Sequence, residues 1–245
     1  MDRSPSRPSP VRDLVLFICG PALVMIAVAA WFAVAPWPVP VPQQAQEFTL
    51  APLATSLVVG AFGVWLSSRV GLPSAPALTD IRRWTWLVLA SAGLGVALVA
   101  ATAIMDASLG LERFMAQRIG RPSINVPFPA SVAHYLYGGI AQESLFRIGP
   151  VPILAWLIGK LAFRDATKAQ VFWAVAMAFS LLQPALESVM VFRARPDIAL
   201  TMLGVGLVGS IAWVGLYRRF GWPAVLVVRI VVELGWHVVW PALSV

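Results

Sequence analysis

Glu143 and Arg147 place a carboxylate and a guanidinium group four residues apart in a stretch of chain that is otherwise apolar. Four residues make about one turn of an α-helix, so the two side chains share a face and can form an ion pair. Charged side chains at membrane depth are costly and usually face the interior of a helix bundle or a water-filled cavity. We therefore predict that this pair borders a polar cavity inside a membrane.

Polar side chains recur at helical spacing in three apolar runs: Gln142, Glu143 and Arg147 in 126–147, Gln183 and Glu187 in 169–192, and Arg229, Glu233 and His237 in 222–240. If the three helices surround one cavity, these stripes converge on it. The alternative is structural, with buried ion pairs that fasten helices together and fix their register. Three such stripes together favour a functional or ancestral cavity.

A metal site is a further possibility in the last of these runs. Glu233 and His237 are residue types that bind zinc, but a zinc site normally takes at least three protein ligands. No third ligand stands near them in the sequence, so we predict neither a metal nor another cofactor. His134 lies roughly opposite Glu143 around its helix and is interpreted as a packing or interfacial histidine.

The composition indicates an integral membrane protein. Of the 245 residues, 59% are hydrophobic and 12% are charged, whereas soluble domains carry roughly 25% charged residues. The net charge of +7 resides mostly on arginines at the ends of apolar runs, where such residues orient the chain and contact lipid headgroups. Membrane lipids are therefore the expected partners, and nucleic acid is not. The single cysteine, Cys19, excludes an intrachain disulfide.

Seven apolar runs come close to the roughly 20 residues that a membrane-spanning helix needs: 14–35, 53–70, 84–105, 126–147, 169–192, 198–217 and 222–240. An eighth run, 150–163, is shorter and fits a re-entrant or tilted interfacial helix better than a full crossing. We predict an all-α, polytopic bundle of seven to eight transmembrane helices. A basic tail at 1–13 precedes a single membrane domain at 14–245.

Two connecting segments have a distinctive composition. Residues 36–42 alternate proline with other residues and predict a stiff polyproline connector. The run before this connector is longer than the apolar part of a signal peptide, and Pro36 directly follows the only plausible cleavage site, so we interpret it as an uncleaved helix. Residues 106–125 form the longest polar loop, and their apolar spacing suggests a short interfacial helix.

Basic loop residues predict the orientation of the bundle. If 126–163 crosses once, one side holds eleven basic residues: Arg3, Arg7, Arg12, Arg69, Arg82, Arg83, Lys160, Arg164, Lys168, Arg218 and Arg219. The other side holds five: Arg113, Arg118, Arg121, Arg193 and Arg195. A full crossing by 150–163 would make the count eight against eight. The positive-inside rule therefore favours one crossing and a cytoplasmic N-terminus, in a bacterial inner membrane.

Small residues mark positions of close helix contact. Gly204-Val-Gly-Leu-Val-Gly209 matches the letters of a dinucleotide-binding fingerprint, which requires a preceding strand and a later acidic residue. The motif lies inside an apolar span and has neither, so we interpret its glycines as helix-packing positions. Ser91 and Gly95 also permit tight packing, either within one chain or between two.

Residues 126–240 resemble the CPBP family, the CAAX proteases and bacteriocin-processing proteins of membranes. Ala141-Gln-Glu-Ser-Leu-Phe-Arg147 resembles the first family motif, Glu-Glu-x-x-x-Arg, and Phe179-Ser-Leu-Leu-Gln183 resembles the second, Phe-x-x-x-His. The stretch from Trp222 to Glu233 resembles the last, in which His-x-x-x-Asn follows a Trp-Pro-Ala entry. The resemblance implies a bundle of about eight helices that hydrolyses peptides near a membrane-embedded site.

The chain departs from the family at all four positions to which the resemblance assigns chemistry. Gln142 and Gln183 replace the Glu and His thought to activate water, and Arg229 and Glu233 replace the His and Asn thought to stabilise the oxyanion. A neutral amide does not accept a proton from water at physiological pH, and general-base assistance is typically worth about 10²–10⁴-fold. A carboxylate at Glu233 would also repel a developing oxyanion unless it were neutralised.

The sequence therefore favours a non-catalytic CPBP-like membrane protein. Its ion-paired former active site would bind a membrane-protein partner, a prenyl-like or pigment-like lipid, or a larger membrane complex. The alternative is an active intramembrane endopeptidase in which Glu143 works with rewired partners such as Glu187 and His237. A small transporter is a third class, but it needs a continuous polar path, and the sequence offers one cluster and no repeat symmetry.

Overall fold

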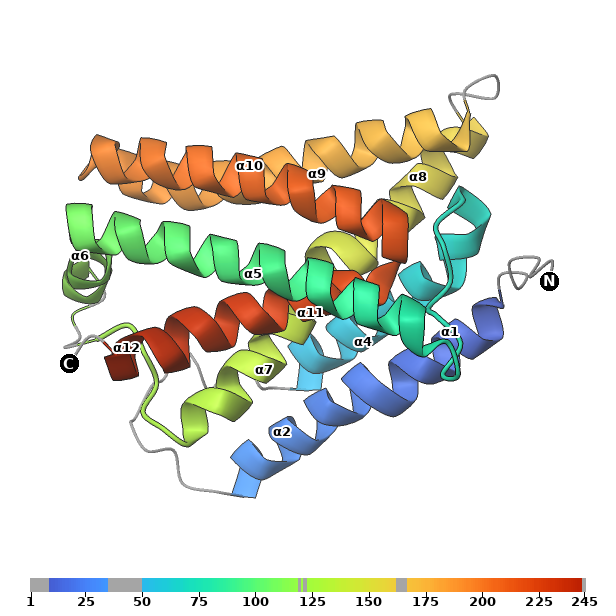
Figure 1. Cartoon of the computed structure of the whole chain (residues 1–245), viewed down its shortest axis with the longest axis horizontal. Coiled ribbons are helices and arrows are strands. Elements are labelled where there is room, and N and C mark those ends of the chain that lie inside the picture. The colour runs from blue at the N-terminus through green and yellow to red at the C-terminus, as the bar shows by residue number, and fades with distance from the viewer. Residues whose placement is uncertain (1–8, 35–49, 119, 121–122, 162–166, 244–245) are drawn as a thin grey trace.

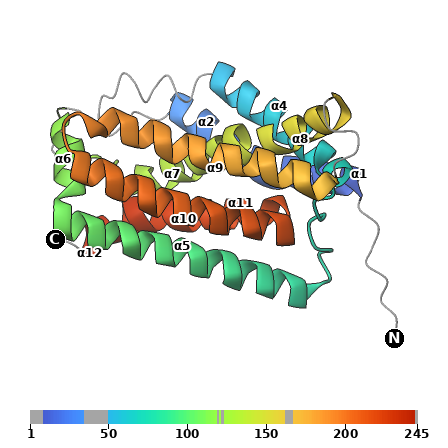
Figure 2. The same cartoon turned by 90° about the horizontal axis from the view of Figure 1, so that it is seen from above.

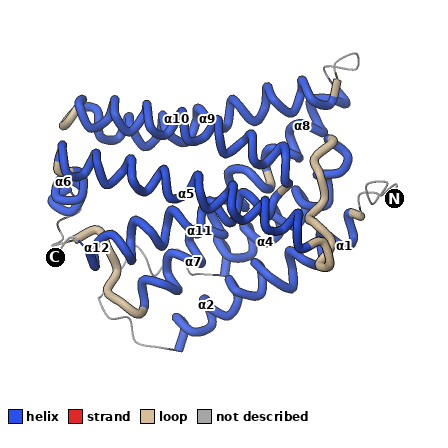
Figure 3. The backbone as a smooth tube through the Cα atoms, in the orientation of Figure 1, coloured by secondary structure: helices blue, strands red, loops and turns tan. Residues whose placement is uncertain are grey.

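The computed structural model describes residues 9–34, 50–118, 120, 123–161 and 167–243. Within these ranges every regular element is a helix (Figure 3). Seven helical segments are long and apolar enough to cross a membrane: Pro10–Phe32, Ala51–Val70, Ile81–Leu109, Ala130–Leu161, Lys168–Phe192, Pro196–Phe220 and Trp222–Leu243. The chain is thus an all-α, polytopic membrane bundle.

The individual elements follow the predicted runs closely. The α-helices are α1 (Pro10–Phe17), α2 (Leu23–Val34), α4 (Leu50–Ser67), α5 (Ile81–Leu109), α6 (Leu111–Arg118), α7 (Ala130–Glu143), α8 (Pro150–Leu161), α9 (Lys168–Phe192), α10 (Pro196–Phe220), α11 (Trp222–Leu234) and α12 (Trp240–Leu243). A 3₁₀ turn, η2 (Ser68–Val70), ends the second segment, and π-helical turns interrupt three others: η1 (Ile18–Ala22), η3 (Ser144–Ile148) and η4 (Gly235–Val239).

The short run at 150–163 does not form a separate crossing. Helix α8 follows α7 and η3 within one apolar segment of 32 residues, Ala130–Leu161. Gly149 and Pro150 stand at the junction, where a proline at the first helical position costs no hydrogen bond. The segment from 126 to 161 therefore makes one bent passage through the bundle (Figure 1), the arrangement that the loop charges favour.

The long helices lie side by side, and their connections gather at two ends of the bundle (Figures 1 and 2). Helix α10 packs along α9 and α5, and α11 packs between α5 and α7. The described basic residues of the predicted cytoplasmic set belong to the end of the bundle at which α1 begins: Arg12, Arg69, Arg82, Arg83, Lys160, Lys168, Arg218 and Arg219. Arg113, Arg118, Arg193 and Arg195 belong to the other end. The predicted polyproline connector and Arg3, Arg7, Arg121 and Arg164 lie outside the described residues.

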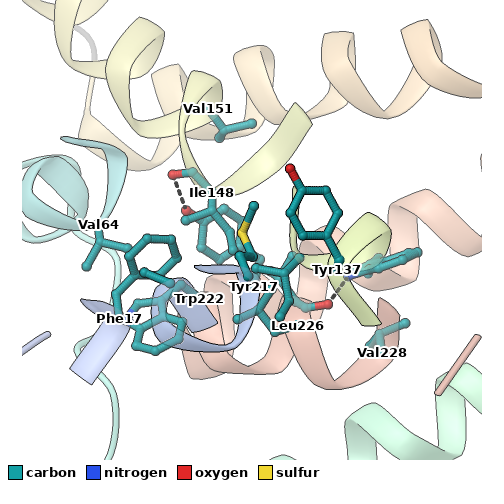
Figure 4. Close-up of a cluster of buried hydrophobic side chains, with 14 of the residues drawn as sticks. Phe17, Val64, Tyr137, Ile148, Val151, Tyr217, Trp222, Leu226 and Val228 are labelled. Atoms are coloured by element: carbon teal, nitrogen blue, oxygen red, sulfur yellow. Dashed lines mark hydrogen bonds between the residues drawn. The ribbon is translucent and has the colours of Figure 1, made fainter. Parts of the chain in front are cut away.

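A buried apolar cluster packs around the turn η3 (Figure 4). Phe17 meets Trp222 edge-on, with ring centroids 5.7 Å apart. The Tyr217 hydroxyl donates to the Ile148 carbonyl oxygen at 3.5 Å, which ties α10 to the π-helical turn η3. All four side chains are at most 5% exposed, so this cluster fixes η3, and with it Arg147, against its neighbours.

Glycines permit the closest helix approaches. A Cβ atom on Gly206 would lie 2.7 Å from Pro184 Cβ, and one on Gly209 would lie 2.5 Å from Leu98 Cδ2. Gly206 and Gly209 are therefore helix-packing positions, as predicted, whereas a Cβ on Gly204, the first glycine of the motif, would meet nothing within 4 Å. A Cβ on Gly95 would lie 2.7 Å from Val231 Cγ1, so this small residue serves packing within the chain.

Candidate functional site

The predicted ion pair between Glu143 and Arg147 forms and is fully enclosed. Arg147 Nη1 donates to Glu143 Oε1 at 2.7 Å, and the two side chains are 5% and 0% exposed. Arg147 Nη2 donates to Ser210 Oγ at 3.3 Å, and its guanidinium carbon lies 4.2 Å from the centre of the Trp213 ring. Arg147 thus joins the turn η3 to α10 through charge, hydrogen bonding and a cation–π contact.

A second, largely buried ion pair lies within α11 and is hydrogen-bonded to α7. The guanidinium group of Arg229 forms an ion pair with Glu233 and donates a hydrogen bond to the side-chain oxygen of Gln142. Gly139 makes room for this contact, because a Cβ there would lie 3.2 Å from Arg229 Cγ and 3.3 Å from Glu233 Cγ. Three of the four motif positions that depart from the CPBP pattern are therefore bonded to one another.

His237 extends this network toward the end of the bundle that carries α6. Asn125 Nδ2 donates to Glu112 Oε1 at 3.2 Å, so Asn125 Oδ1 is an acceptor and His237 Nδ1, 2.7 Å away, carries the hydrogen. His237 Nε2 then faces Glu233 Oε2 at 3.6 Å. Tyr135 stacks on the imidazole with ring centroids 4.0 Å apart and planes at 6°. Asn125 consequently sets the tautomer and orientation of His237.

Sequence reasoning missed this outer part of the network. Asn125 stands 112 residues from His237 in the chain, and the apolar spacing of its loop indicated a helix but not this contact. Only the composition of the loop could have indicated its role, because residues 106–125 form the longest polar segment between two spans. Glu112, in the predicted short interfacial helix, accepts hydrogen bonds from both Asn125 Nδ2 and Ser123 Oγ.

The third polar stripe borders the same space. Gln183 Nε2 donates to Glu187 Oε1 at 3.1 Å, one helical turn along α9. Gln183 is buried and Glu187 is exposed. The bond orients the Gln183 amide, because a carboxylate accepts hydrogen bonds and does not donate them when ionised.

A cavity of about 570 Å³ brings the three stripes together. Its polar lining includes Arg147, Gln183, Glu187, Arg229 and His237 of the predicted residues. Gln142, Glu143 and Glu233 do not line it and lie behind Arg147 and Arg229, to which they are bonded. Its remaining wall comes from α5, α6, α9, α10 and α11 and is predominantly apolar. Arg118, the last residue of α6, also lines the cavity and was not among the predicted site residues.

His134 lies within the packed part of the molecule. Its side chain is 7% exposed and meets the Tyr135 ring edge-on at 4.7 Å. This position fits the packing role that the sequence suggested. Among the described residues, no group of three or more His, Cys, Asp and Glu side chains is arranged to hold a metal ion.

The arrangement offers little for general-base hydrolysis. Gln142 and Gln183 are amides, and Glu143 is committed to Arg147 in full burial. Arg229 is likewise committed to Gln142 and Glu233. No protein-family model, curated protein or solved structure gives a match to this chain. The resemblance to the CPBP family therefore rests on the motifs alone.

Proposed function

We propose that this protein is a non-catalytic, CPBP-like integral membrane protein whose ion-paired cavity holds an amphipathic molecule of the membrane. The observation that carries this proposal is the bonding of Arg229 to both Gln142 and Glu233 beside a cavity of about 570 Å³. Three of the four motif positions bond to one another, while an apolar-walled space remains open next to Arg229. Pockets of roughly 300–1,000 Å³ with few polar groups are typical of small-molecule sites.

Prenyl-like and pigment-like lipids both belong to the class of ligand that such a cavity accommodates. A membrane-protein partner or a larger membrane complex is compatible with the same proposal, because a bound lipid and a bound subunit can share one polytopic scaffold. The ion pair Glu143–Arg147 then positions η3, and Arg229, which pairs with Glu233 within α11, connects α11 to α7 through its hydrogen bond to Gln142.

A specific observation favours hydrolysis as the second candidate. Asn125 orients His237 so that its Nε2 faces Glu233 beside the cavity, an arrangement that resembles the base and orienting residue of nucleophilic hydrolases. An endopeptidase would then use His237 or Glu143 as a rewired base. The weakness of this candidate is that His237 is directed at a carboxylate already paired with Arg229.

Purification in mild detergent from the native membrane separates the two functions. We expect an amphipathic molecule or a membrane-protein partner at about one per chain, identified by mass spectrometry of the extract. We also expect no cleavage of membrane peptides by the wild type, and the same co-purifying molecule with Glu143→Gln. Peptide turnover that Glu143→Gln abolishes while the variant stays folded would contradict the proposal and establish the endopeptidase.

We further propose a cytoplasmic N-terminus in a bacterial inner membrane, on the basis of the basic residues at that end of the bundle. In a Cys19→Ser background, Lys168→Cys is expected to react with a membrane-impermeant thiol reagent only in inverted vesicles. Arg113→Cys, at the start of α6, is expected to react only in intact cells. Both side chains are exposed, so the side of the membrane on which each residue lies decides whether the reagent reaches it. The reverse pattern would invert the proposed orientation.

A further inference from the structure

The charges on the cavity wall do not all pair with one another. Arg147 is paired with Glu143 and Arg229 with Glu233, which leaves Arg118 and Glu187 as the other charged lining residues. In the part of the chain that the structure describes, neither of these two forms an ion pair. The cavity therefore presents one positive and one negative group that its own residues do not neutralise.

These two groups are placed to meet a ligand. Glu187 is exposed, and the hydrogen bond from Gln183 Nε2 holds its carboxylate beside the cavity. Arg118 is also exposed and ends α6, at the end of the bundle opposite the start of α1 (Figure 1). Glu187 stands five residues before the end of α9 at Phe192, so both charges are close to helix ends, where lipid head groups are expected in a membrane.

The remaining wall is soft and apolar. Four of the seven methionines of the chain line it: Met105, Met115, Met190 and Met202. Methionine side chains are flexible and polarizable, and they adapt to irregular apolar ligands. Trp213 and Trp236 add aromatic surface. A hydrocarbon chain fits such a wall, and a cavity of about 570 Å³ is sized for one such chain rather than for a two-chain phospholipid.

We propose that the cavity binds a zwitterionic, single-chain phospholipid, with its phosphate at Arg118, its ammonium at Glu187 and its acyl chain along the methionines. This inference rests on the proposed function and narrows its ligand to one class. A purely anionic amphipath would leave Glu187 facing a like charge, and a neutral one would leave both charges without a counterpart. Only a head group with both signs complements the two residues together.

Three probes with the same oleoyl chain test the inference: lysophosphatidylethanolamine, lysophosphatidylglycerol and monooleoylglycerol. Each is titrated as a radiolabelled ligand into the full-length protein in nanodiscs. We expect saturable binding of one lysophosphatidylethanolamine per chain, several-fold tighter than binding of either other probe. Partly exposed charge contacts typically contribute about fivefold or less in affinity each. The test is therefore the order of the three dissociation constants and not the value of any one of them.

Two charge-removing variants refine the test. Arg118→Gln is expected to weaken both phospholipid probes by about two- to fivefold and to leave monooleoylglycerol unchanged. Glu187→Gln is expected to weaken lysophosphatidylethanolamine by a similar factor and to leave lysophosphatidylglycerol unchanged or tighter. Arg113→Gln is the matched control, because Arg113 is exposed on the same helix and should affect no probe.

Equal binding of the zwitterionic and anionic probes, with no effect of Glu187→Gln, would replace the inference with a simple anion site. Equal binding of all three probes, or saturable binding of none, would also overturn it. If the native extract then still contained another amphipath at one per chain, the proposed function would stand and only the ligand class would be wrong. Peptide turnover that depends on Glu143 would instead overturn the proposed function itself.

Discussion

Arg147→Ala is expected to destabilise the folded protein by about 3–5 kcal/mol, because it leaves the carboxylate of Glu143 buried without its counter-charge. Glu143 is 0% exposed, and its Oε2 atom has no hydrogen-bond partner among the described residues even in the wild type. Arg147 therefore supplies the main compensation for burying this charge. The change also removes the hydrogen bond to Ser210 and the contact with Trp213. Unfolding of the purified protein in mixed micelles, followed as the fraction of denaturing detergent rises, measures the loss.

A double variant shows whether the unpaired charge is the cause. Glu143→Leu with Arg147→Met replaces the pair by apolar side chains of similar length, and such replacements of buried pairs are often neutral or stabilising. We expect the double variant to recover most of the stability that Arg147→Ala loses. Asp197→Asn is the matched surface control, because the Asp197 carboxylate pairs with Arg195 at side-chain exposures of 47% and 37%. Its loss should cost at most about 1 kcal/mol. A double variant as unstable as Arg147→Ala would assign the effect to packing on Trp213 instead.

The parts of the site that the sequence predicted are those governed by local periodicity. Glu143 with Arg147, Arg229 with Glu233, and Gln183 with Glu187 are each four residues apart, and helix geometry alone brings such pairs together. The three stripes share a cavity because a lipid-facing charge is so costly that each helix must turn its polar face inward. Because polar groups are costly in lipid, the lengths of the apolar runs also predict the seven spans.

The features that the sequence did not predict depend on contacts between distant segments. Asn125 contacts His237 across the fold, and no spacing rule joins residues 112 positions apart. Arg118 was counted as a loop charge, and its place on the cavity wall follows from how α6 sits against the bundle. The sequence also does not predict which glycines are needed for packing. Gly63 and Gly93 both lie in apolar runs, but a Cβ on Gly63 would clash with the backbone of η3 and one on Gly93 would meet nothing within 4 Å.

Gly63→Ala is the second change with a large expected effect, because it adds one carbon atom where two backbones meet. A Cβ on Gly63 would lie 2.1 Å from the Ile148 carbonyl oxygen and 2.5 Å from Gly149 Cα, so no side-chain rotation can relieve the clash. Either α4 or the turn η3 must move, and η3 carries Arg147. Overpacking in cores typically costs about 1–3 kcal/mol, and we expect this variant to reach the upper end of that range or exceed it.

Gly93→Ala makes the same chemical change with the opposite expected sign. A Cβ on Gly93 would meet nothing within 4 Å, and the residue lies inside helix α5. Alanine favours a helix interior over glycine by about 0.5–1 kcal/mol, so this variant should be neutral or slightly more stable than the wild type. Both variants are compared with the wild type in the same mixed-micelle unfolding assay and for co-purification of the bound amphipath. Because a shifted η3 displaces Arg147 from Ser210 and Trp213, Gly63→Ala should lose ligand as well as stability, whereas Gly93→Ala should keep both. Equal stability of the two variants would mean that α4 and η3 do not approach as closely as this packing requires.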